Sequence, residues 1–172
     1  MIITNNEEAL RIKCEDVLKD EINDLILSLE SELNNANRLG KNGIGLAAPQ
    51  IGIAKNIAII RMGNNLNINL INCKIDKLYD SAMFRDEGCL SFPNRVEDTL
   101  RFQEILLINN FVYPHSFIAT GLLAVAIQHE VDHLNSVLFM DHKISKQINK
   151  RINPNDLCYC GSSRKFKKCC RK

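Results

Sequence analysis

The segment TGLLAVAIQHEVDHL (residues 120–134) limits the possible folds most, because it is strongly apolar and yet carries two histidines four residues apart. We expect a buried helix over about 120–135, with His129 and His133 one turn apart on one face. Two imidazoles so placed can bind one metal ion, and Glu130 would lie beside that ion and could take a proton from a metal-bound water. The alternative is an ordinary amphipathic helix whose two histidines are satisfied by other groups.

The rest of the chain alternates between one further helical pattern and short apolar runs. Apolar residues at helical spacing predict a helix over 16–39, which the glycines at 40 and 43 would end. Runs rich in β-branched residues predict strands at 56–62, 67–73 and 103–109. Together these elements predict a fold that contains both helices and strands.

A third metal ligand is not present in the histidine segment itself. EGCLS (87–91) supplies a candidate in Cys89, within a stretch that we expect to be extended. One thiolate and two imidazoles leave a coordination position open for water, which is typical of catalytic rather than structural centres. Taken alone, Cys89 could equally be a small buried thiol.

The glycine-rich stretch GIGLAAPQ (43–50) resembles a dinucleotide fingerprint only superficially. Gly43, Gly45 and Ala48 fit its GxGxxA spacing, but a helix and a turn precede them and Pro49 prevents a following helix. We therefore expect no nucleotide cofactor. A loop that lets a substrate backbone come close is the better interpretation, with the side-chain amide of Gln50 as a donor.

Composition and charge indicate an acidic globule followed by a basic end. Of the 22 Lys/Arg and 20 Asp/Glu, residues 1–142 hold 12 and 19, a net charge of −7, and residues 143–172 hold 10 and 1, a net charge of +9. The sequence shows neither an apolar run long enough to span a membrane nor a secretory signal, so we expect a cytoplasmic protein that does not contact membranes. Its seven cysteines then favour metal ligands or free thiols, and Cys14 and Cys73 are expected to be buried or free.

The motifs GIGLAAPQ, EGCLS and QHEVDHL, in this order, resemble those of the peptide deformylases over roughly residues 1–142. The resemblance implies an α+β fold with antiparallel strands around the central HExxH helix. It also implies removal of the formyl group from the N-terminal formyl-methionine of nascent peptides, with release of formate. The metal, typically Fe²⁺ with Zn²⁺ or Ni²⁺ as alternatives, would be held by Cys89, His129 and His133.

The resemblance also implies roles for residues around the metal. A metal-bound water would be the nucleophile and Glu130 the general base and then the general acid. Gln50 and the backbone N–H of Leu90 would stabilise the oxyanion, and Gly45 would admit the substrate carbonyl. The residues implied to contact the substrate are Ile44, Arg95, Leu122, Val125 and Ala126. Departures from the family pattern at Phe92, Asn94 and Ser136 affect neither a ligand nor the base.

The end of the chain, NPNDLCYCGSSRKFKKCC, resembles the SEC-C motif over residues 153–172, joined to the catalytic domain (1–142) by a basic linker (143–152). The resemblance implies a small zinc knot in which one structural Zn²⁺ is bound by Cys158, Cys160, Cys169 and Cys170. A disulfide-linked or disordered basic tail is the alternative. The tail would dock on the ribosome or on an acidic partner such as a chaperone. A different class of function, an adaptor with an inactive deformylase-like domain, also remains open.

Overall fold

The computed structural model describes residues 1–63, 65–111, 115–144, 154–155 and 164–168. Its helices are α1 (Glu7–Leu10), α2 (Ile22–Arg38) and α3 (Gly121–Leu134), with short 3₁₀ turns η1 (Ala48–Ile51), η2 (Phe139–His142) and η3 (Phe166–Lys168). Its strands are β1 (Gly45–Ala47), β2 (Ile57–Met62), β3 (Leu66–Ile71), β4 (Lys74–Cys89), β5 (Phe92–Ile108) and β6 (Ser116–Thr120).

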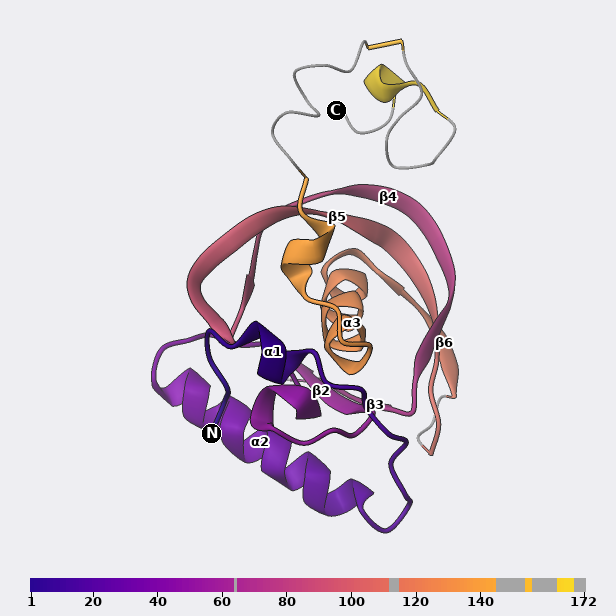
Figure 1. Ribbon diagram of the computed structural model, residues 1–172. Helices are drawn as coiled ribbons and strands as arrows, with labels where there is room; N and C mark the ends of the chain where they lie inside the picture. Colours follow the sequence, from indigo (N-terminus) through magenta and orange to yellow (C-terminus); the bar gives the residue numbers. More distant parts are fainter. Residues whose placement is uncertain (64, 112–114, 145–153, 156–163, 169–172) are drawn as a thin grey trace.

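The strands form two antiparallel sheets, ordered β1-β2-β3 and β4-β5-β6. The long, curved strands β4 and β5 arch over α3, and α2 runs on the outer side of β1, β2 and β3 (Figure 1). The α+β fold with antiparallel strands around the histidine helix is therefore confirmed.

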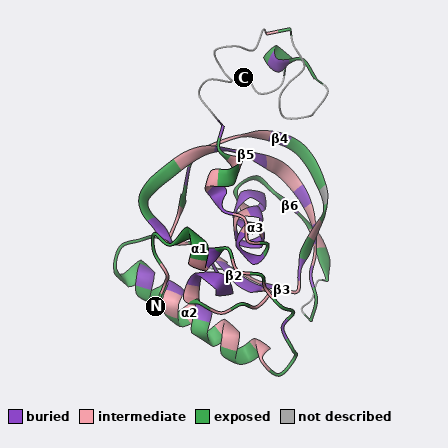
Figure 2. Ribbon diagram, viewed as in Figure 1, coloured by how far each residue is buried: buried purple, intermediate pink, exposed green. Residues whose placement is uncertain are grey.

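Helix α3 is the centre of the core. It follows β6 directly, because Thr120 is extended and Gly121 adopts a φ of +59° that few other residues tolerate. Figure 2 shows α3 buried along most of its length, while α2 keeps an exposed outer face. Ala124, Ile127 and Val131 pack against side chains of both sheets, including Ile60 and Ile105. A helix that is apolar on most sides is stable only when surrounded in this way.

The first long helix starts later than its pattern predicts, at Ile22 rather than at residue 16. Val17 is buried, and its backbone N–H and C=O both bond the side chain of Asn72. Glu15 forms a parallel bridge with Lys55. These contacts hold the chain extended up to Val17, so the apolar residues here pack from a non-helical backbone.

A bulge interrupts β4 shortly before Cys89. The register with β5 shifts between Phe84 and Glu87, and Asp86 adopts a positive φ of 53°. Such a bulge bends the strand and re-aims its side chains. The carboxylate of Glu87 is consequently buried, with 4% of the residue exposed, while its neighbour Asp86 is exposed.

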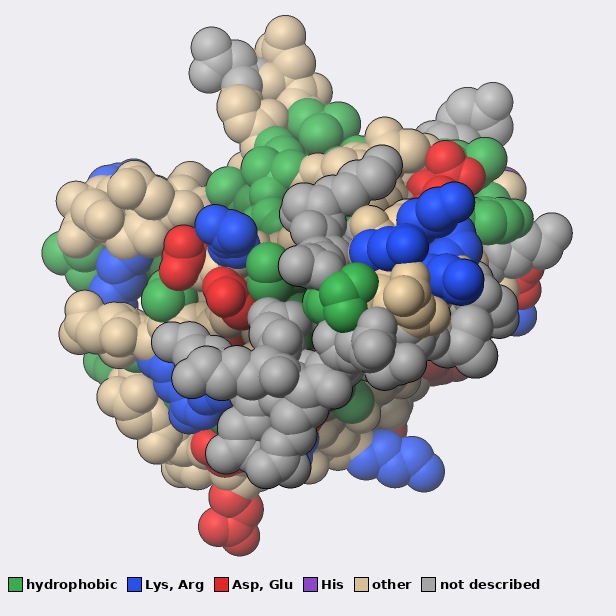
Figure 3. All heavy atoms as spheres, turned by 90° about the horizontal axis from the view of Figure 1, so that it is seen from above, with side chains coloured by type: hydrophobic (Ala, Val, Ile, Leu, Met, Phe, Trp, Pro, Cys, Tyr) green, Lys and Arg blue, Asp and Glu red, His purple; other side chains and the backbone are tan. Residues whose placement is uncertain are grey.

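The described part of the C-terminal segment carries positive charge. Arg164, Lys165, Lys167 and Lys168 are exposed around the buried Phe166, and Arg164 pairs with Asp80 of β4 at 2.9 Å. Figure 3, which looks down on this end of the molecule, shows a group of Lys and Arg side chains there. Within the described ranges, no helix is both long enough and apolar enough to cross a membrane.

Candidate metal centre

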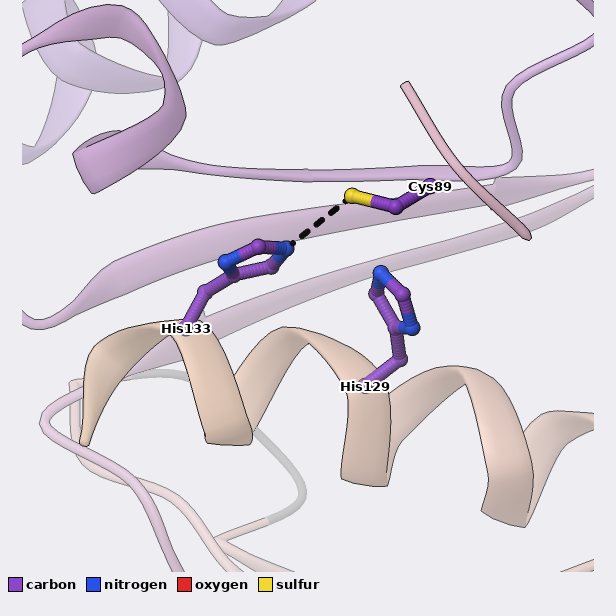
Figure 4. A group of neighbouring side chains, drawn as sticks. All are labelled: Cys89, His129 and His133. Carbon is purple, nitrogen blue, oxygen red and sulfur yellow. Dashed lines mark hydrogen bonds between the residues drawn. The ribbon is translucent and has the colours of Figure 1, made fainter. Parts of the chain in front are cut away.

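Cys89, His129 and His133 come together although they lie up to 44 residues apart in the sequence. One potential ligand atom from each lies within 4.8 Å of the other two. The thiol at the end of β4 faces the two imidazoles on successive turns of α3, and Cys89 Sγ is 3.3 Å from His133 Nε2 (Figure 4). The four-residue spacing on α3 and the extended EGC segment thus produce the convergence that the sequence predicts.

The carboxylate of Glu87 fixes the orientation of the His129 ring. Its Nδ1–H donates to Glu87 Oε1 at 2.6 Å, so Nε2 is the nitrogen that would face a metal. Burial lowers the pKa of His129, but Cys89 and Glu87 raise it well above 6.5, so the ring is protonated until a metal displaces the proton. A carboxylate behind a ligating imidazole fixes the tautomer and makes the ring a stronger ligand. Figure 4 shows one ring nitrogen of His129 pointing toward the space beside Cys89.

Glu87 is itself held by buried partners that our sequence analysis missed. Arg101 donates from Nη2 and Nε to the two carboxylate oxygens at 2.6 and 2.8 Å, and the Thr99 hydroxyl also donates to Oε2. The remaining guanidinium nitrogen, Nη1, reaches Asp132 Oδ2 at 2.6 Å. Burial alone would raise the pKa of Glu87, but the hydrogen bonds from His129 and Arg101 lower it to about 2, so the carboxylate is charged.

The His133 ring has the protonation state that metal binding requires. It is fully buried, and burial, together with the nearby charges of His129 and Arg101, lowers its pKa well below 6.5. The ring is therefore neutral, the form in which histidine binds metals. Its Nδ1 is one of the few buried side-chain atoms in the described chain without a hydrogen-bond partner.

Glu130 lies beside the three candidate ligands and is buried with one oxygen, Oε2, unpaired within the described chain. Burial raises its pKa to about 7 against the opposing charge of His129, and the charges of Asp132 and Glu87 add to the rise. A buried carboxylate with an unpaired oxygen normally costs free energy. The unpaired oxygen, the neutral His133 and the thiol–imidazole–imidazole donor set together fit a divalent metal.

Gly45 makes room for Glu130. A Cβ at this position would lie 2.3 Å from Glu130 Oε1, closer than any real contact. We predicted that Gly45 admits a substrate carbonyl, and the structure adds this second reason for a residue without a side chain.

Gln50 is fixed by bonds on both ends of its amide. Its Oε1 accepts from the backbone N–H of Ala47 at 2.8 Å, and its Nε2 lies 3.1 Å from Ser91 Oγ and 3.4 Å from Cys89 Sγ. The amide donor thus faces the candidate metal centre. Leu90 follows Cys89 in the turn between β4 and β5, and its side chain packs against Gly43.

A pocket of about 570 Å³ opens onto this centre. Its lining includes Cys89, His129 and Glu130 as well as every residue that was expected to contact substrate: Ile44, Arg95, Leu122, Val125 and Ala126. Gly45, Gln50 and Leu90 line it too. The four cysteines expected to bind zinc, Cys158, Cys160, Cys169 and Cys170, lie outside the described residues.

A Cys–His–His donor set beside a buried glutamate, at the end of a pocket, is the arrangement of a metal-dependent hydrolase. Comparison with known proteins makes the class specific. The family model "Polypeptide deformylase" matches residues 1–150, and the SEC-C motif matches residues 155–172. The chain belongs to the peptide deformylase family and is a hydrolase that removes N-formyl groups from peptides.

Individual relatives agree in sequence and in structure. Peptide deformylase 1 of Clostridium perfringens is 40% identical over 144 residues, which cover 81% of this chain and 95% of that protein. Peptide deformylase 1 of Bacillus subtilis is 36% identical over 158 residues, covering 84% and 89%. The crystal structure of a Synechococcus elongatus peptide deformylase in complex with actinonin superposes with a TM-score of 0.74 at 33% identity, covering 87% of this chain and 82% of that one.

Proposed function

We propose that Cys89, His129 and His133 bind the divalent metal with which this deformylase removes the formyl group of N-terminal formyl-methionine. The convergence of their three ligand atoms within 4.8 Å carries this proposal. Fe²⁺ is the metal we favour, by the resemblance to the family, and Zn²⁺ or Ni²⁺ could replace it. When bound, the cation supplies Lewis-acid polarisation of the formyl group and makes water acidic enough to be deprotonated near neutral pH.

Glu130 moves the proton. Burial raises the pKa of Glu130 in the metal-free chain, and a buried carboxylate beside the reacting water can both accept a proton and return it. Its unpaired Oε2 takes the proton from the attacking water and then delivers it to the departing amine nitrogen of methionine. The C–N bond of the formamide breaks, and formate and a free N-terminal amine are the products.

Gln50 and the backbone N–H of Leu90 stabilise the negative charge that develops on the formyl oxygen. Support for Gln50 comes from the fixed position of its Nε2, beside Cys89 and Ser91, because a donor already in place needs no reorganisation during the reaction. Removing one such donor typically lowers the rate by about 10²- to 10³-fold.

The substrate side chain occupies the apolar part of the pocket. Val125 and Ala126 are almost fully buried, whereas Ile44 and Leu122 are 37% and 51% exposed nearer the opening. These four residues fit an unbranched apolar side chain such as methionine. Arg95, also at the exposed end, donates to the peptide that follows the methionine.

The rival function, an adaptor with an inactive domain, predicts no particular geometry at the centre. The alignment of Glu87 behind His129 and the space left by Gly45 for Glu130 instead favour a site that is kept functional.

Cobalt substitution tests the ligand set directly. Co²⁺ bound to a thiolate gives a charge-transfer absorption, and the difference spectrum between wild-type and Cys89→Ser proteins isolates Cys89, since the tail cysteines are common to both. We expect the band at one equivalent of Co²⁺ per catalytic site in the wild type and its loss, with weaker metal binding, in the variant. Identical spectra and metal contents would show that the third ligand lies elsewhere.

The C-terminal segment, residues 153–172, has a separate proposed role. We propose that Cys158, Cys160, Cys169 and Cys170 bind one structural Zn²⁺ and that the basic segment around them docks the enzyme near its substrate. Formylated N-termini emerge in the cytoplasm from the ribosome, whose surface is rich in RNA phosphate. The exposed cations at 164, 165, 167 and 168 are suited to contacts with phosphate, and an acidic chaperone is the alternative partner that the experiment distinguishes.

Deletion of residues 153–172 tests the docking. The truncated enzyme should deformylate a tripeptide nearly as fast as the full chain but co-sediment less with ribosomes. The co-sedimentation of the full chain should also fall steeply with salt, because phosphate contacts release counterions. Equal co-sedimentation of both proteins at low salt would refute ribosome docking, and a tail fold that survives chelation would refute the zinc knot.

A further inference from the structure

A row of alternating charges starts at Arg95, in the wall of the pocket, and runs outward from it. The guanidinium of Arg95 places Nε and Nη2 each 3.3 Å from Glu97 Oε1, and Lys143 Nζ lies 2.7 Å from Glu97 Oε2. Arg95 lines the pocket, and the Glu97 side chain, which is only 14% exposed, lies between the two cations.

Lys143 is held in place by its backbone. It forms an antiparallel bridge with Thr99 of β5, and the N–H of Ile144 donates to the carbonyl of Asp98 at 2.8 Å. Ile144 is 7% exposed. Residues 143 and 144, which we predicted to begin a linker, are thus fixed on the strand that carries Glu97 and Arg95.

The charge on Glu97 is secured by this arrangement. The hydrogen bond from the Lys143 ammonium is the main cause that lowers the pKa of Glu97 below its ordinary value; burial opposes it, and the Arg95 guanidinium adds a smaller lowering effect. Glu97 therefore offers a full negative charge to one edge of the Arg95 guanidinium. Among the described residues, the remaining nitrogen, Nη1, pairs only with the Glu7 carboxylate, at 3.9 Å.

The position of Arg95 in the pocket indicates which part of a bound peptide it would contact. Glu130 and His129 lie at the buried end, and Arg95 lies at the exposed end of the same pocket. A peptide whose formyl group is next to Glu130 can therefore contact Arg95 as it leaves the pocket. The free edge of the guanidinium can then donate to carbonyl oxygens of the peptide backbone.

We propose that Glu97 and Lys143 are positioning residues that hold Arg95 for binding of the peptide beyond its first residue. The proposal rests on the deformylase function proposed above and adds two residues from outside the three motifs. Lys143 fixes Glu97, Glu97 occupies one edge of the Arg95 guanidinium, and the other edge is thereby directed to the substrate.

Two substrates separate this role from a general structural one. Formyl-methioninamide ends after methionine, whereas a formyl-Met tripeptide extends to Arg95. Glu97→Gln should raise the ratio of the tripeptide KM to the amide KM about two- to fivefold, the effect of losing an exposed ion pair. Lys143→Met should raise it less and Lys143→Arg should restore it, while Lys74→Met, on the edge of β4, is the control for loss of an exposed lysine.

The Arg95→Ala background shows whether the effect passes through Arg95. In that background neither Glu97→Gln nor Lys143→Met should change the KM ratio further. An unchanged ratio in the single variants, an equal rise in both KM values, or the same rise in the Arg95→Ala background would overturn the proposal. Failure of the metal-loaded wild type to release formate from either substrate would instead overturn the deformylase function on which it rests.

Discussion

Arg101 and Glu87 form a buried two-point ion pair, with Nη2 2.6 Å from Oε1 and Nε 2.8 Å from Oε2. Only 1% of the Arg101 side chain and 4% of the Glu87 side chain are exposed. Buried ion pairs seldom add net stability, because desolvation of both charges offsets their attraction. This pair instead holds the carboxylate that orients His129, which links β5 to the metal centre.

Glu87→Gln should therefore weaken metal binding. The amide can still accept from His129 Nδ1–H, but it lacks the charge that strengthens the imidazole as a ligand. Partners of this kind typically contribute about 10- to 100-fold in metal affinity. Competition with a chelator measures the effect, and Asp76→Asn, which removes an exposed carboxylate from the same strand, is the matched control. Equal metal affinity of the two variants would refute the role of Glu87.

Arg101→Met should lower the free energy of unfolding. It leaves Glu87 and, in part, Asp132 as buried charges without their partner, which typically costs about 3–5 kcal/mol. Denaturant unfolding of the metal-free protein measures this loss. Adding Glu87→Gln to Arg101→Met should recover part of it, and a double variant less stable than Arg101→Met alone would contradict this explanation.

Gly45→Ala should impair catalysis more than folding. The new methyl group would meet Glu130 Oε1 at 2.3 Å, so the glutamate must move from its place beside the metal. Gly88→Ala is the comparison, because its methyl group would meet nothing closer than Val96 at 3.6 Å. We expect a much larger fall in kcat for Gly45→Ala, and similar kcat values for the two variants would contradict the steric argument.

Cys73 and Cys14 should resist alkylation in the native protein. Burial raises the pKa of Cys73 to about 12 and that of Cys14 to about 11, so almost no thiolate is present at pH 8. Mass spectrometry after iodoacetamide treatment at pH 8 should find both unmodified, and both modified once the chain is unfolded. Rapid labelling of native Cys73 would show that its surroundings open readily.

The central helix, its two histidines and the convergence of Cys89 with them could be predicted from the sequence, because a four-residue spacing and a local motif contain the relevant geometry. Strand β4 could not, since KIDKLYDSAMFRDEGC carries many charges and lacks a clear alternation. Its structure depends on pairing with β5 through a bulge, which is a tertiary effect.

Glu87 and Arg101, which support the candidate metal centre without supplying a ligand, were missed for the same reason. Arg101 lies 14 residues from Glu87, and only the register of β5 brings them together. A signal did exist for Glu87, which stands two residues before Cys89 in an extended segment and so shares its side of the strand. Lys143 was assigned to a linker by its polar surroundings, and its bridge to Thr99 has no local sequence signal.

Formate release from a formyl-Met tripeptide, measured anaerobically with metal content determined on the same sample, tests the central claim most directly. We predict turnover by the Fe²⁺-loaded full-length protein, its loss on chelation and its return with Fe²⁺. Glu130→Gln should retain the metal and lose about 10²- to 10⁴-fold in turnover, because an amide cannot accept the proton. Undiminished formate release by the metal-free protein or by metal-loaded Glu130→Gln would contradict the account.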